Sequence, residues 1–126
     1  MTGRKIVVVE DNELNMKLFR EVLGSSGYKT LEAETGERAV ALAIEHRPDL
    51  VLMDIHLPDI DGVEALRLLR GHERTGSVPV VALTAQAMEG DRERFLAAGF
   101  DGYLSKPVNI ADLLDAVRRY CEGGSR

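Results

Sequence analysis

The chain has 126 residues, of which 44% are hydrophobic and 29% are charged. This size and composition are typical of one compact soluble domain and exclude a disordered, collagen-like or disulfide-rich protein. Sixteen Lys and Arg against 21 Asp and Glu give a formal net charge of −5, which disfavours direct binding to nucleic acid. The single cysteine, Cys121, cannot form an internal disulfide, and no apolar run is long enough for membrane insertion. We therefore expect a cytoplasmic protein.

Short apolar runs without polar alternation recur along the chain, a pattern typical of strands that are buried on both faces of a parallel sheet. The four clearest runs are residues 6–9, 50–53, 78–83 and 102–104. A weaker strand is predicted at residues 28–33, after a turn rich in Ser and Gly.

Helical stripes of apolar residues separate these strands. Asp61, with Glu64 three residues later, has the spacing of a capping box at the start of the third helix, and Asn109 is placed to cap the last one. Residues 88–98 contain few apolar side chains and form the least distinct helix. The stripes are Leu14, Leu18 and Val22; Ala39, Val40, Ala43 and Ile44; Leu66 and Leu69; and Ile110, Leu113, Leu114, Val117 and Cys121.

The chain thus alternates strand and helix five times, which predicts an α/β fold with a parallel sheet covered by helices on both faces. In such folds ligands bind beyond the carboxyl ends of the strands. The residues that directly follow each strand are therefore the candidates for chemistry.

Acidic residues gather at these strand ends. Glu10 and Asp11 follow the first strand, Asp54 ends the third, Thr84 follows the fourth and Lys106 lies just beyond the fifth. Three clustered carboxylates repel one another, and at neutral pH this arrangement requires a bound cation or raised pKa values. Oxygen ligands without a Cys or His pair favour Mg²⁺ over Zn²⁺.

Beside a bound Mg²⁺, the Asp54 carboxylate could attack a phosphoryl group and become a phosphate acceptor. Lys106 would supply a positive charge for one phosphoryl oxygen, and the Thr84 hydroxyl could hydrogen-bond another. The strand ends therefore contain each part that phosphoryl transfer to a carboxylate needs.

These motifs resemble a response-regulator receiver domain. The resemblance rests on Glu10-Asp11, on Asp54 within Leu52-Met53-Asp54-Ile55-His56-Leu57-Pro58, on Gly62, on Thr84-Ala85 and on Lys106-Pro107. It implies a doubly wound, flavodoxin-like and CheY-like sheet of five parallel strands in the order 2-1-3-4-5, with five helices. The expected receiver spans residues 1–122, and residues 123–126 form a frayed tail.

The resemblance also implies a metal site and a phosphoryl donor. Mg²⁺, or Mn²⁺ in its place, would be held by Asp11, Asp54 and the main-chain carbonyl of His56, with Glu10 acting through water. Asp is commoner than Glu at the position of Glu10 in the family. The phosphoryl group would come from a sensor histidine kinase or a histidine phosphotransfer protein. The peptide bond before Pro107 is expected to be cis.

Further roles follow from the same resemblance. Thr84 and Tyr103 would be the switch pair, and His56 and Gln86 would tune the lifetime of the phosphoryl group. The kinase or phosphotransfer protein would dock on Asn15, Leu18 and Pro107. A Leu stripe of this kind usually belongs to a core, which is the alternative role for Leu18.

The expected function is that of a stand-alone response regulator without enzymatic activity beyond self-phosphorylation and slow autodephosphorylation. Because the receiver fills the chain, the output would be protein contact through the face of the fourth helix, fifth strand and fifth helix. A monomer or a weak phosphorylation-dependent dimer is expected. Residues 9–19 and 87–91 resemble single-domain receivers of cell-cycle or cell-polarity control.

Four alternatives compete with this function. The protein could be an intermediate in a phosphorelay. It could be an aspartate-nucleophile phosphatase, but that chemistry wants a second Asp where His56 stands. A flavodoxin-like cofactor binder would need a phosphate loop where Glu10 and Asp11 would repel an anion. A receiver-like binder that is never phosphorylated is disfavoured because Asp54 and its partner residues are all in place.

Overall fold

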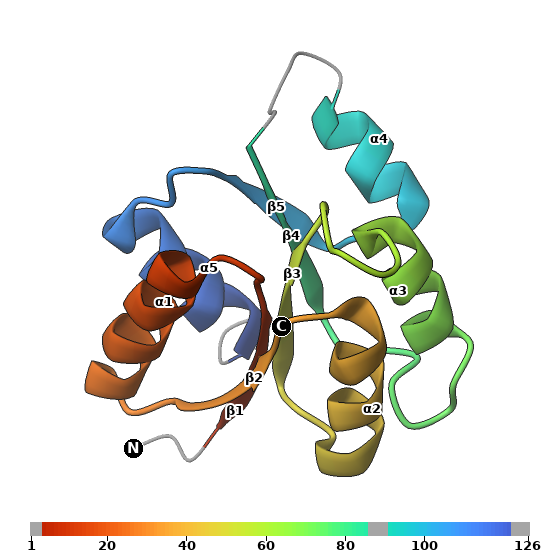
Figure 1. The fold of residues 1–126 in the computed structure, drawn as a ribbon, viewed down its shortest axis with the longest axis horizontal. Helices are drawn as coiled ribbons and strands as arrows, with labels where there is room; N and C mark the ends of the chain where they lie inside the picture. Colours follow the sequence, from red (N-terminus) through yellow and green to blue (C-terminus); the bar gives the residue numbers. More distant parts are fainter. Residues whose placement is uncertain (1–3, 86–90, 122–126) are drawn as a thin grey trace.

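Five parallel strands and five helices alternate along the chain in the computed structural model, which describes residues 4–85 and 91–121 (Figure 1). The strands pair in the order β2-β1-β3-β4-β5. The predicted fold class and strand order are therefore confirmed. The elements are β1 (Lys5–Val9), α1 (Glu13–Ser25), β2 (Lys29–Ala33), α2 (Gly36–His46), β3 (Leu50–Asp54), α3 (Gly62–Arg70), β4 (Val80–Thr84), α4 (Asp91–Ala98), β5 (Gly102–Ser105) and α5 (Ile110–Cys121).

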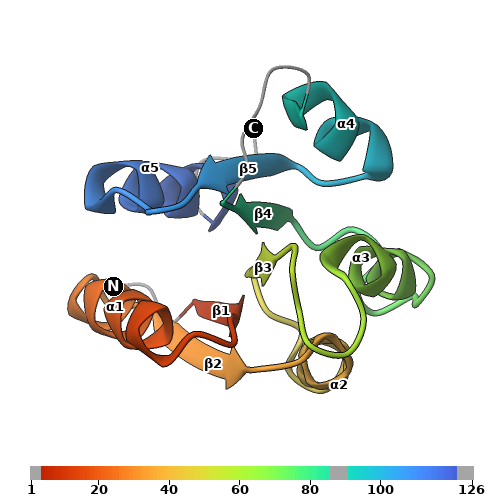
Figure 2. The same cartoon turned by 45° about the horizontal axis from the view of Figure 1, so that its top comes forward.

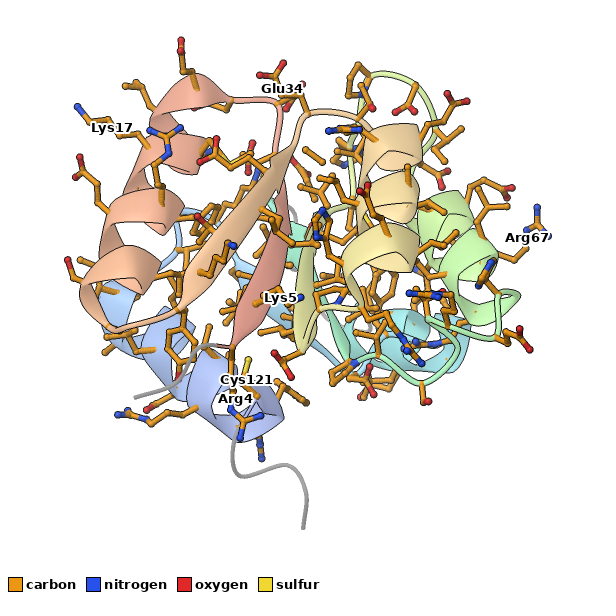
Figure 3. The ribbon with its side chains drawn as sticks, turned by 90° about the horizontal axis from the view of Figure 1, so that it is seen from below. Arg4, Lys5, Lys17, Glu34, Arg67 and Cys121 are labelled. Atoms are coloured by element: carbon orange, nitrogen blue, oxygen red, sulfur yellow. The ribbon has the colours of Figure 1, made fainter. Side chains whose placement is uncertain are left out.

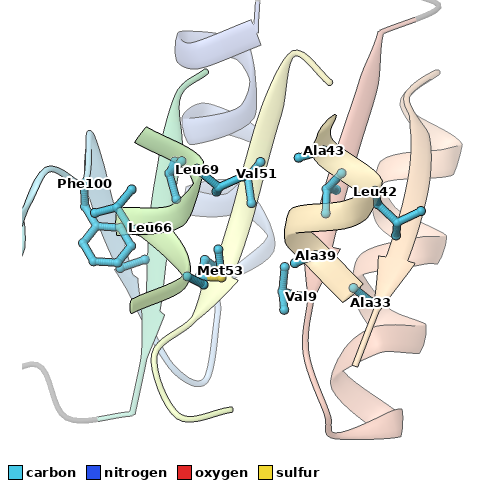
Figure 4. Close-up of a cluster of buried hydrophobic side chains, with 14 of the residues drawn as sticks. Val9, Ala33, Ala39, Leu42, Ala43, Val51, Met53, Leu66, Leu69 and Phe100 are labelled. Carbon is cyan, nitrogen blue, oxygen red and sulfur yellow. The ribbon is translucent and has the colours of Figure 1, made fainter. Parts of the chain in front are cut away.

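The helices cover the sheet on both faces. Helices α1 and α5 lie on one side, and α2, α3 and α4 lie on the other (Figures 1 and 2). Each side has its own apolar cluster. On the α2–α3 side, Leu66 and Leu69 lie beside the strand residues Val51 and Met53, and Leu42 of α2 belongs to the same buried cluster (Figure 4). Burial of these side chains on both faces supplies the main favourable free energy of folding.

Burial along the strands explains why some were easier to predict than others. Every residue of β3 and β4 is buried, because helices cover both faces of these inner strands. The edge strand β2 exposes Lys29 and Glu32 and therefore gives a weaker apolar signal. The fourth strand begins at Val80 rather than at residue 78, since Pro79 has no N–H for the ladder and Val78 N–H donates to the turn carbonyl of Thr75 at 3.2 Å.

The two predicted helix caps are present. Asp61 Oδ1 accepts from Glu64 N–H at 2.8 Å, and Asn109 Oδ1 accepts from Ala111 N–H at 2.7 Å. The Glu64 side chain does not complete the capping box, because it forms an ion pair with Arg67 instead. Two further caps, Asn12 on α1 and Thr35 on α2, were not anticipated.

Helix α1 buries a different face from the Leu stripe that marked it in the sequence. Its buried residues are Met16, Phe19 and Leu23, whereas Leu14 is 79% exposed and Leu18 is half-buried. The helix carries apolar residues on two faces, and the face with the bulky aromatic ring packs against the sheet. Of the Leu stripe, Leu14 therefore lies at the surface, whereas Leu18 and Val22 are half-buried.

Some predictions fall on parts of the chain outside the described residues: Gln86, the first residues of the predicted fourth helix at 88–90, and the tail at 123–126. No helix in the described ranges combines the length and the apolar character that crossing a membrane would require. Lys17 and Arg67 project outward from α1 and α3 on the two sides of the molecule (Figure 3).

Candidate functional site

Three carboxylates meet at the carboxyl ends of β1 and β3. Parallel pairing sets Val9 beside Met53, so the residues that follow them, Glu10 and Asp54, become neighbours. Each of Glu10, Asp11 and Asp54 offers a carboxylate oxygen within 4.8 Å of the others. Glu10 and Asp54 are buried, and Asp11 is exposed. The predicted convergence of acidic residues is therefore observed.

Lys106 bridges the two buried carboxylates. Its Nζ lies 2.8 Å from Glu10 Oε1 and 2.9 Å from Asp54 Oδ2, and its side chain is only 18% exposed. The backbone N–H of Lys106 donates to the carbonyl of Thr84 at 2.7 Å, which anchors this residue to the end of β4. The Lys106–Pro107 peptide bond is cis, as expected. The turn after β5 thus delivers the ammonium group to the acidic cluster.

Burial and charge shift the protonation of this cluster. Burial raises the pKa of Glu10, the nearby Asp54 charge adds to this effect, and contacts with Lys106 and Asn12 N–H oppose it without cancelling it. Burial alone would lower the pKa of Lys106, but its hydrogen bonds to Glu10 and Asp54 outweigh burial and raise it. Lys106 pairs with Glu10 and Asp54, and the exposed Asp11 adds a third carboxylate to the cluster, so acidic groups outnumber the paired ammonium among the described residues.

The donor set fits a hard divalent cation. All three side chains offer carboxylate oxygens, the ligands that Mg²⁺ prefers in proteins. The buried atom Glu10 Oε1 has the Lys106 ammonium beside it and no further hydrogen bond among the described residues. An added positive charge would therefore relieve both the repulsion between carboxylates and the poor solvation of Glu10.

The loop between β3 and α3 (residues 55–61) is held close to Asp54. His56 N–H donates to Asp54 Oδ1 at 3.0 Å, and Gly62 N–H donates to the Ile55 carbonyl at 2.8 Å. A Cβ atom at Gly62 would lie 2.8 Å from the Asp54 carbonyl oxygen, so only glycine fits this close approach. The loop thereby keeps the backbone of His56 at the site while the His56 side chain is exposed.

The predicted switch residues lie on adjacent strands. Thr84 is buried at the end of β4. Tyr103, on β5, is half-buried, and its ring packs against Phe95 of α4 with ring centroids 6.0 Å apart. The aromatic ring therefore connects β5 to α4, while Thr84 lies at the carboxyl edge where the acidic cluster is formed.

The predicted docking residues lie on the α1–α5 side. Asn15 and Leu18 are half-buried on α1, and Pro107 is exposed. Leu18 lines a groove of about 450 Å³ between α1 and α5, together with Val22 and Ile110. The lining of this groove is mainly apolar and also includes Glu21, Ser25 and Ser26.

Sequence reasoning missed the contacts of two residues in the segments that follow Glu10 and Asp54. Asn12 N–H donates to Glu10 Oε2 at 3.1 Å, and Asp59 accepts hydrogen bonds from the N-terminus of α2. Asn12 could have been found as an Asn directly before a helix. Asp59 gave no signal, because its partners lie 22 and 23 residues away in the sequence.

Named relatives are similar to this chain over most of its length. The polar-differentiation response regulator DivK of Brucella anthropi is 44% identical over 117 residues, which cover 93% of this chain and 95% of DivK. DivK of Brucella melitensis has the same identity and coverage. The residues that frame the site are therefore embedded in a chain similar to DivK along almost its entire length.

Solved structures share the fold. The receiver domain of a sensor histidine kinase from Pseudomonas aeruginosa, with a magnesium ion coordinated in its active-site cleft, is 41% identical with a TM-score of 0.87, covering 95% of this chain and 98% of that one. The receiver domain of a Saccharomyces cerevisiae response regulator, crystallised with its histidine phosphotransfer protein, is 28% identical with a TM-score of 0.87, covering 95% and 90%.

The family model of the response regulator receiver domain matches residues 6–118 of this chain. The matched region contains β2 to β5 in full and all of β1 except Lys5. It also contains Glu10, Asp11, Asp54 and Lys106. The acidic cluster, the bridging lysine and the strand order all lie within the matched region. The chain belongs to the response regulator receiver domain family.

Proposed function

We propose that Asp54 accepts a phosphoryl group from a phosphohistidine and that the protein signals through the resulting change in its protein contacts. The observation that carries this proposal is the pairing of buried Asp54 with Lys106 at 2.9 Å, beside two further carboxylates. Clustered carboxylates are unfavourable for folding unless positive charge binds among them. Their presence supports a site for a divalent cation and a phosphoryl group.

Asp11, Asp54 and the main-chain carbonyl of His56 would hold the cation, Mg²⁺ or Mn²⁺, with Glu10 acting through water. When bound, the cation supplies positive charge that neutralises phosphoryl oxygens. The residual negative charge of the cluster and its oxygen donors support this assignment.

The Asp54 carboxylate is the nucleophile. One of its oxygens forms a bond to phosphorus while the phosphorus–nitrogen bond of phosphohistidine breaks, and the electron pair of the broken bond stays on the imidazole. Lys106 stabilises the charge on one phosphoryl oxygen, and the Thr84 hydroxyl donates a hydrogen bond to another. Water later releases inorganic phosphate and regenerates the carboxylate, at a rate that His56 and Gln86 tune.

Phosphorylation replaces the single negative charge of the Asp54 carboxylate with an acyl phosphate of about −1.5 to −2, a net change of about −0.5 to −1. This charge attracts Lys106 and draws the Thr84 hydroxyl inward, and Tyr103 moves from its present packing on Phe95 into the space behind. The equilibrium then shifts toward a second arrangement of the face made by α4, β5 and α5. Downstream proteins bind this face, where a groove of about 1060 Å³ runs along β5 and α5.

The phosphoryl donor is a sensor histidine kinase or a histidine phosphotransfer protein that docks on Asn15, Leu18 and Pro107. The apolar groove beside Leu18 supports this placement. The yeast receiver crystallised with a phosphotransfer protein supports this class of partner. A relay intermediate would use the same site.

Residues 1–122 form the receiver, which acts as a monomer or a weak phosphorylation-dependent dimer. The DivK relatives, named for polar differentiation, support a role in cell-cycle or cell-polarity control.

Phosphotransfer from a labelled histidine kinase tests the proposal. Wild-type protein is expected to acquire the label when Mg²⁺ is present, and the Asp54→Asn variant is expected to acquire none. The Asp115→Asn variant serves as a control, because Asp115 is an exposed acid on α5. Label that persists on Asp54→Asn would contradict the assignment of the acceptor.

A turnover assay separates this function from the phosphatase alternative. With small phosphate esters we expect no release of phosphate beyond one equivalent per protein in the time of the kinase assay. Many cycles of ester hydrolysis, lost in the Asp54→Asn variant, would favour a phosphatase instead.

A further inference from the structure

Asp59 ties the β3–α3 loop to the start of α2. Its Oδ1 accepts from Gly36 N–H at 2.8 Å, and its Oδ2 accepts from Glu37 N–H at 2.9 Å. In Figure 2 the yellow-green loop that follows β3 passes close to the start of α2. These two N–H groups belong to the first turn of α2, which has no intrahelical acceptors for them. One carboxylate thus joins two elements that are far apart in the sequence.

The contact is specific in both charge and shape. Slight burial would raise the pKa of Asp59, but the N–H groups of Gly36 and Glu37 outweigh it and lower the pKa, so the carboxylate is charged at neutral pH. A Cβ atom at Gly36 would lie 2.6 Å from Ile60 Cγ1, which shows how closely the loop packs on the helix. Leu57 and Ile60 of the loop also pack against the buried cluster beneath α2.

The other end of the same loop carries the backbone of His56. His56 N–H donates a hydrogen bond to Asp54 Oδ1, and Gly62 N–H donates to the Ile55 carbonyl at the base of the loop. The loop is therefore fixed at Asp54, at its base and, through Asp59, at α2. A main-chain carbonyl has no rotatable side chain, so its position follows the conformation of the loop that contains it.

We propose that Asp59 is a positioning residue, which holds the β3–α3 loop so that the main-chain carbonyl of His56 is set for the divalent cation. This inference rests on the proposed function, because it assumes that a cation binds beside Asp54. Asp59 touches neither the cation nor the phosphoryl group. Residues that orient metal ligands typically change metal affinity about 10-fold to 100-fold when they are replaced.

Thr35 provides a matched control within the same helix. Its side chain accepts from Arg38 N–H at 3.1 Å and so caps the same first turn of α2. The three N–H groups at residues 36–38 are thus divided between one cap from the loop and one from the helix's own N-cap residue. Removing either cap weakens α2, but only removal of Asp59 releases the loop.

The test measures Mg²⁺ affinity by calorimetry on the wild type and on the Asp59→Ala, Asp59→Asn and Thr35→Ala variants. Urea unfolding of each variant monitors stability, and amide NMR spectra monitor Gly36, Glu37 and His56. We expect Mg²⁺ binding about 10-fold weaker in Asp59→Ala, a smaller loss in Asp59→Asn, which keeps one oxygen acceptor, and unchanged affinity in Thr35→Ala. Added Mg²⁺ should shift the Gly36 and Glu37 amide signals in wild type and no longer in Asp59→Ala.

Wild-type Mg²⁺ affinity in both Asp59 variants would overturn the inference. Equal weakening in Asp59→Ala and Thr35→Ala would also overturn it, because capping of α2 alone would then explain the effect. If Asp59→Ala fails to fold, Asp59→Asn against Thr35→Ala decides by the same criteria. A wild-type protein that binds no Mg²⁺ would instead contradict the proposed function itself, and this inference with it.

Discussion

Two positively charged side chains, Arg70 and Lys106, lie at opposite ends of the sheet, and their surroundings differ. At the amino ends of β4 and β5, Arg70 donates to the carbonyls of Val78 at 2.7 Å and Gly99 at 3.1 Å and pairs with Asp101 Oδ2 at 3.0 Å. At the carboxyl ends of β1 and β3, Lys106 pairs with Glu10 and Asp54. Arg70 thus joins the loops that precede β4 and β5, whereas Lys106 joins two carboxylates.

The Arg70 cluster is balanced. One guanidinium meets one carboxylate and neutral carbonyls, and Asp101 Oδ2 also accepts from Val80 N–H at 2.8 Å. In the Lys106 cluster, Glu10, Asp11 and Asp54 lie together, and the ammonium group pairs with two of them, Glu10 and Asp54. Balanced, hydrogen-bonded charge stabilises a fold, whereas excess buried charge of one sign destabilises it until a partner binds. The contrast separates a charge-balanced end of the sheet from an acidic end, which we propose to be the reactive one.

The largest effect is expected for Lys106→Met in metal-free protein. Glu10 and Asp54 would remain buried without their counterion, which typically costs about 3 kcal/mol or more of the free energy of unfolding. Added Mg²⁺ should restore a large part of this loss. Urea unfolding with and without Mg²⁺ measures both quantities. A variant as stable as wild type without metal would show that the excess negative charge at this end is not destabilising.

The matching substitution Arg70→Met should cost about 2 kcal/mol, because it removes charge-assisted hydrogen bonds from a half-buried group. Mg²⁺ should add no more stability to this variant than it adds to wild type. The rate of phosphorylation of Asp54 should also be unchanged when the variant is assayed below its unfolding temperature. Slower phosphorylation of the folded Arg70→Met variant would contradict the distinction between the two ends, because Arg70 would then affect the site at the opposite end.

Mg²⁺ should stabilise the wild type by about 1.4 kcal/mol when its concentration is ten times its Kd. Asp11→Asn should lose most of this response, because Asp11 is the exposed acid of the cluster. Asp115→Asn, which changes an exposed acid on α5, should keep it. Thermal unfolding at several Mg²⁺ concentrations gives the comparison, and an unchanged response in Asp11→Asn would remove that residue from the site.

The smallest effect is a pH dependence with opposite signs at two glutamates. Burial raises the pKa of Glu10 in the folded protein above its ordinary value of 4.5. At pH values between the ordinary pKa of Glu10 and its raised pKa in the folded protein, the native state binds more protons than the unfolded state. The contribution of Glu10 to stability therefore falls as pH rises. Without divalent ions, Glu10→Gln should therefore gain on wild type as pH increases from about 4.5 toward neutrality.

Glu32 provides the opposite sign. Its hydrogen bond with Arg20 lowers its pKa below the ordinary 4.5, so the stabilisation it provides is present above that value and is lost as pH falls through the folded-state pKa. Glu32→Gln should thus be less stable than wild type near neutrality, with a difference that disappears in acid. Urea unfolding across pH measures both variants; a Glu10→Gln profile parallel to that of wild type would contradict the raised pKa.

Sequence reasoning located the acidic end of the sheet because its residues directly follow apolar runs. Once the strands are parallel, Glu10, Asp54 and Lys106 must approach one another, and their residue types indicate the chemistry. The caps Asp61 and Asn109 were predictable for a similar reason, because each accepts from an N–H group only two or three residues further along the chain. Such features depend on neighbours within a few residues or on the order of the strands.

The charge-balanced end was not predicted, because its contacts depend on how loops fold back. Arg70 looks like any helix-terminal arginine, yet Asp101, its partner, lies 31 residues away. The choice between the Leu14 and Phe19 faces of α1 likewise depends on packing against the sheet, since both faces are apolar. Asp59 belongs to the same class of contact, and its sequence neighbours indicate only a turn.

Covalent phosphorylation of Asp54 is the most direct test of the difference between the two ends. The protein would be incubated with phosphoramidate, with Mg²⁺ or with a chelator, and intact mass and peptide mapping after borohydride reduction would locate the acyl phosphate. We predict one phosphoryl group at Asp54 in wild type and in Arg70→Met with Mg²⁺, and none with the chelator or in Asp54→Asn. A phosphoryl group on another residue, or equal modification with the chelator, would contradict a cation-dependent acceptor at the carboxyl end of the sheet.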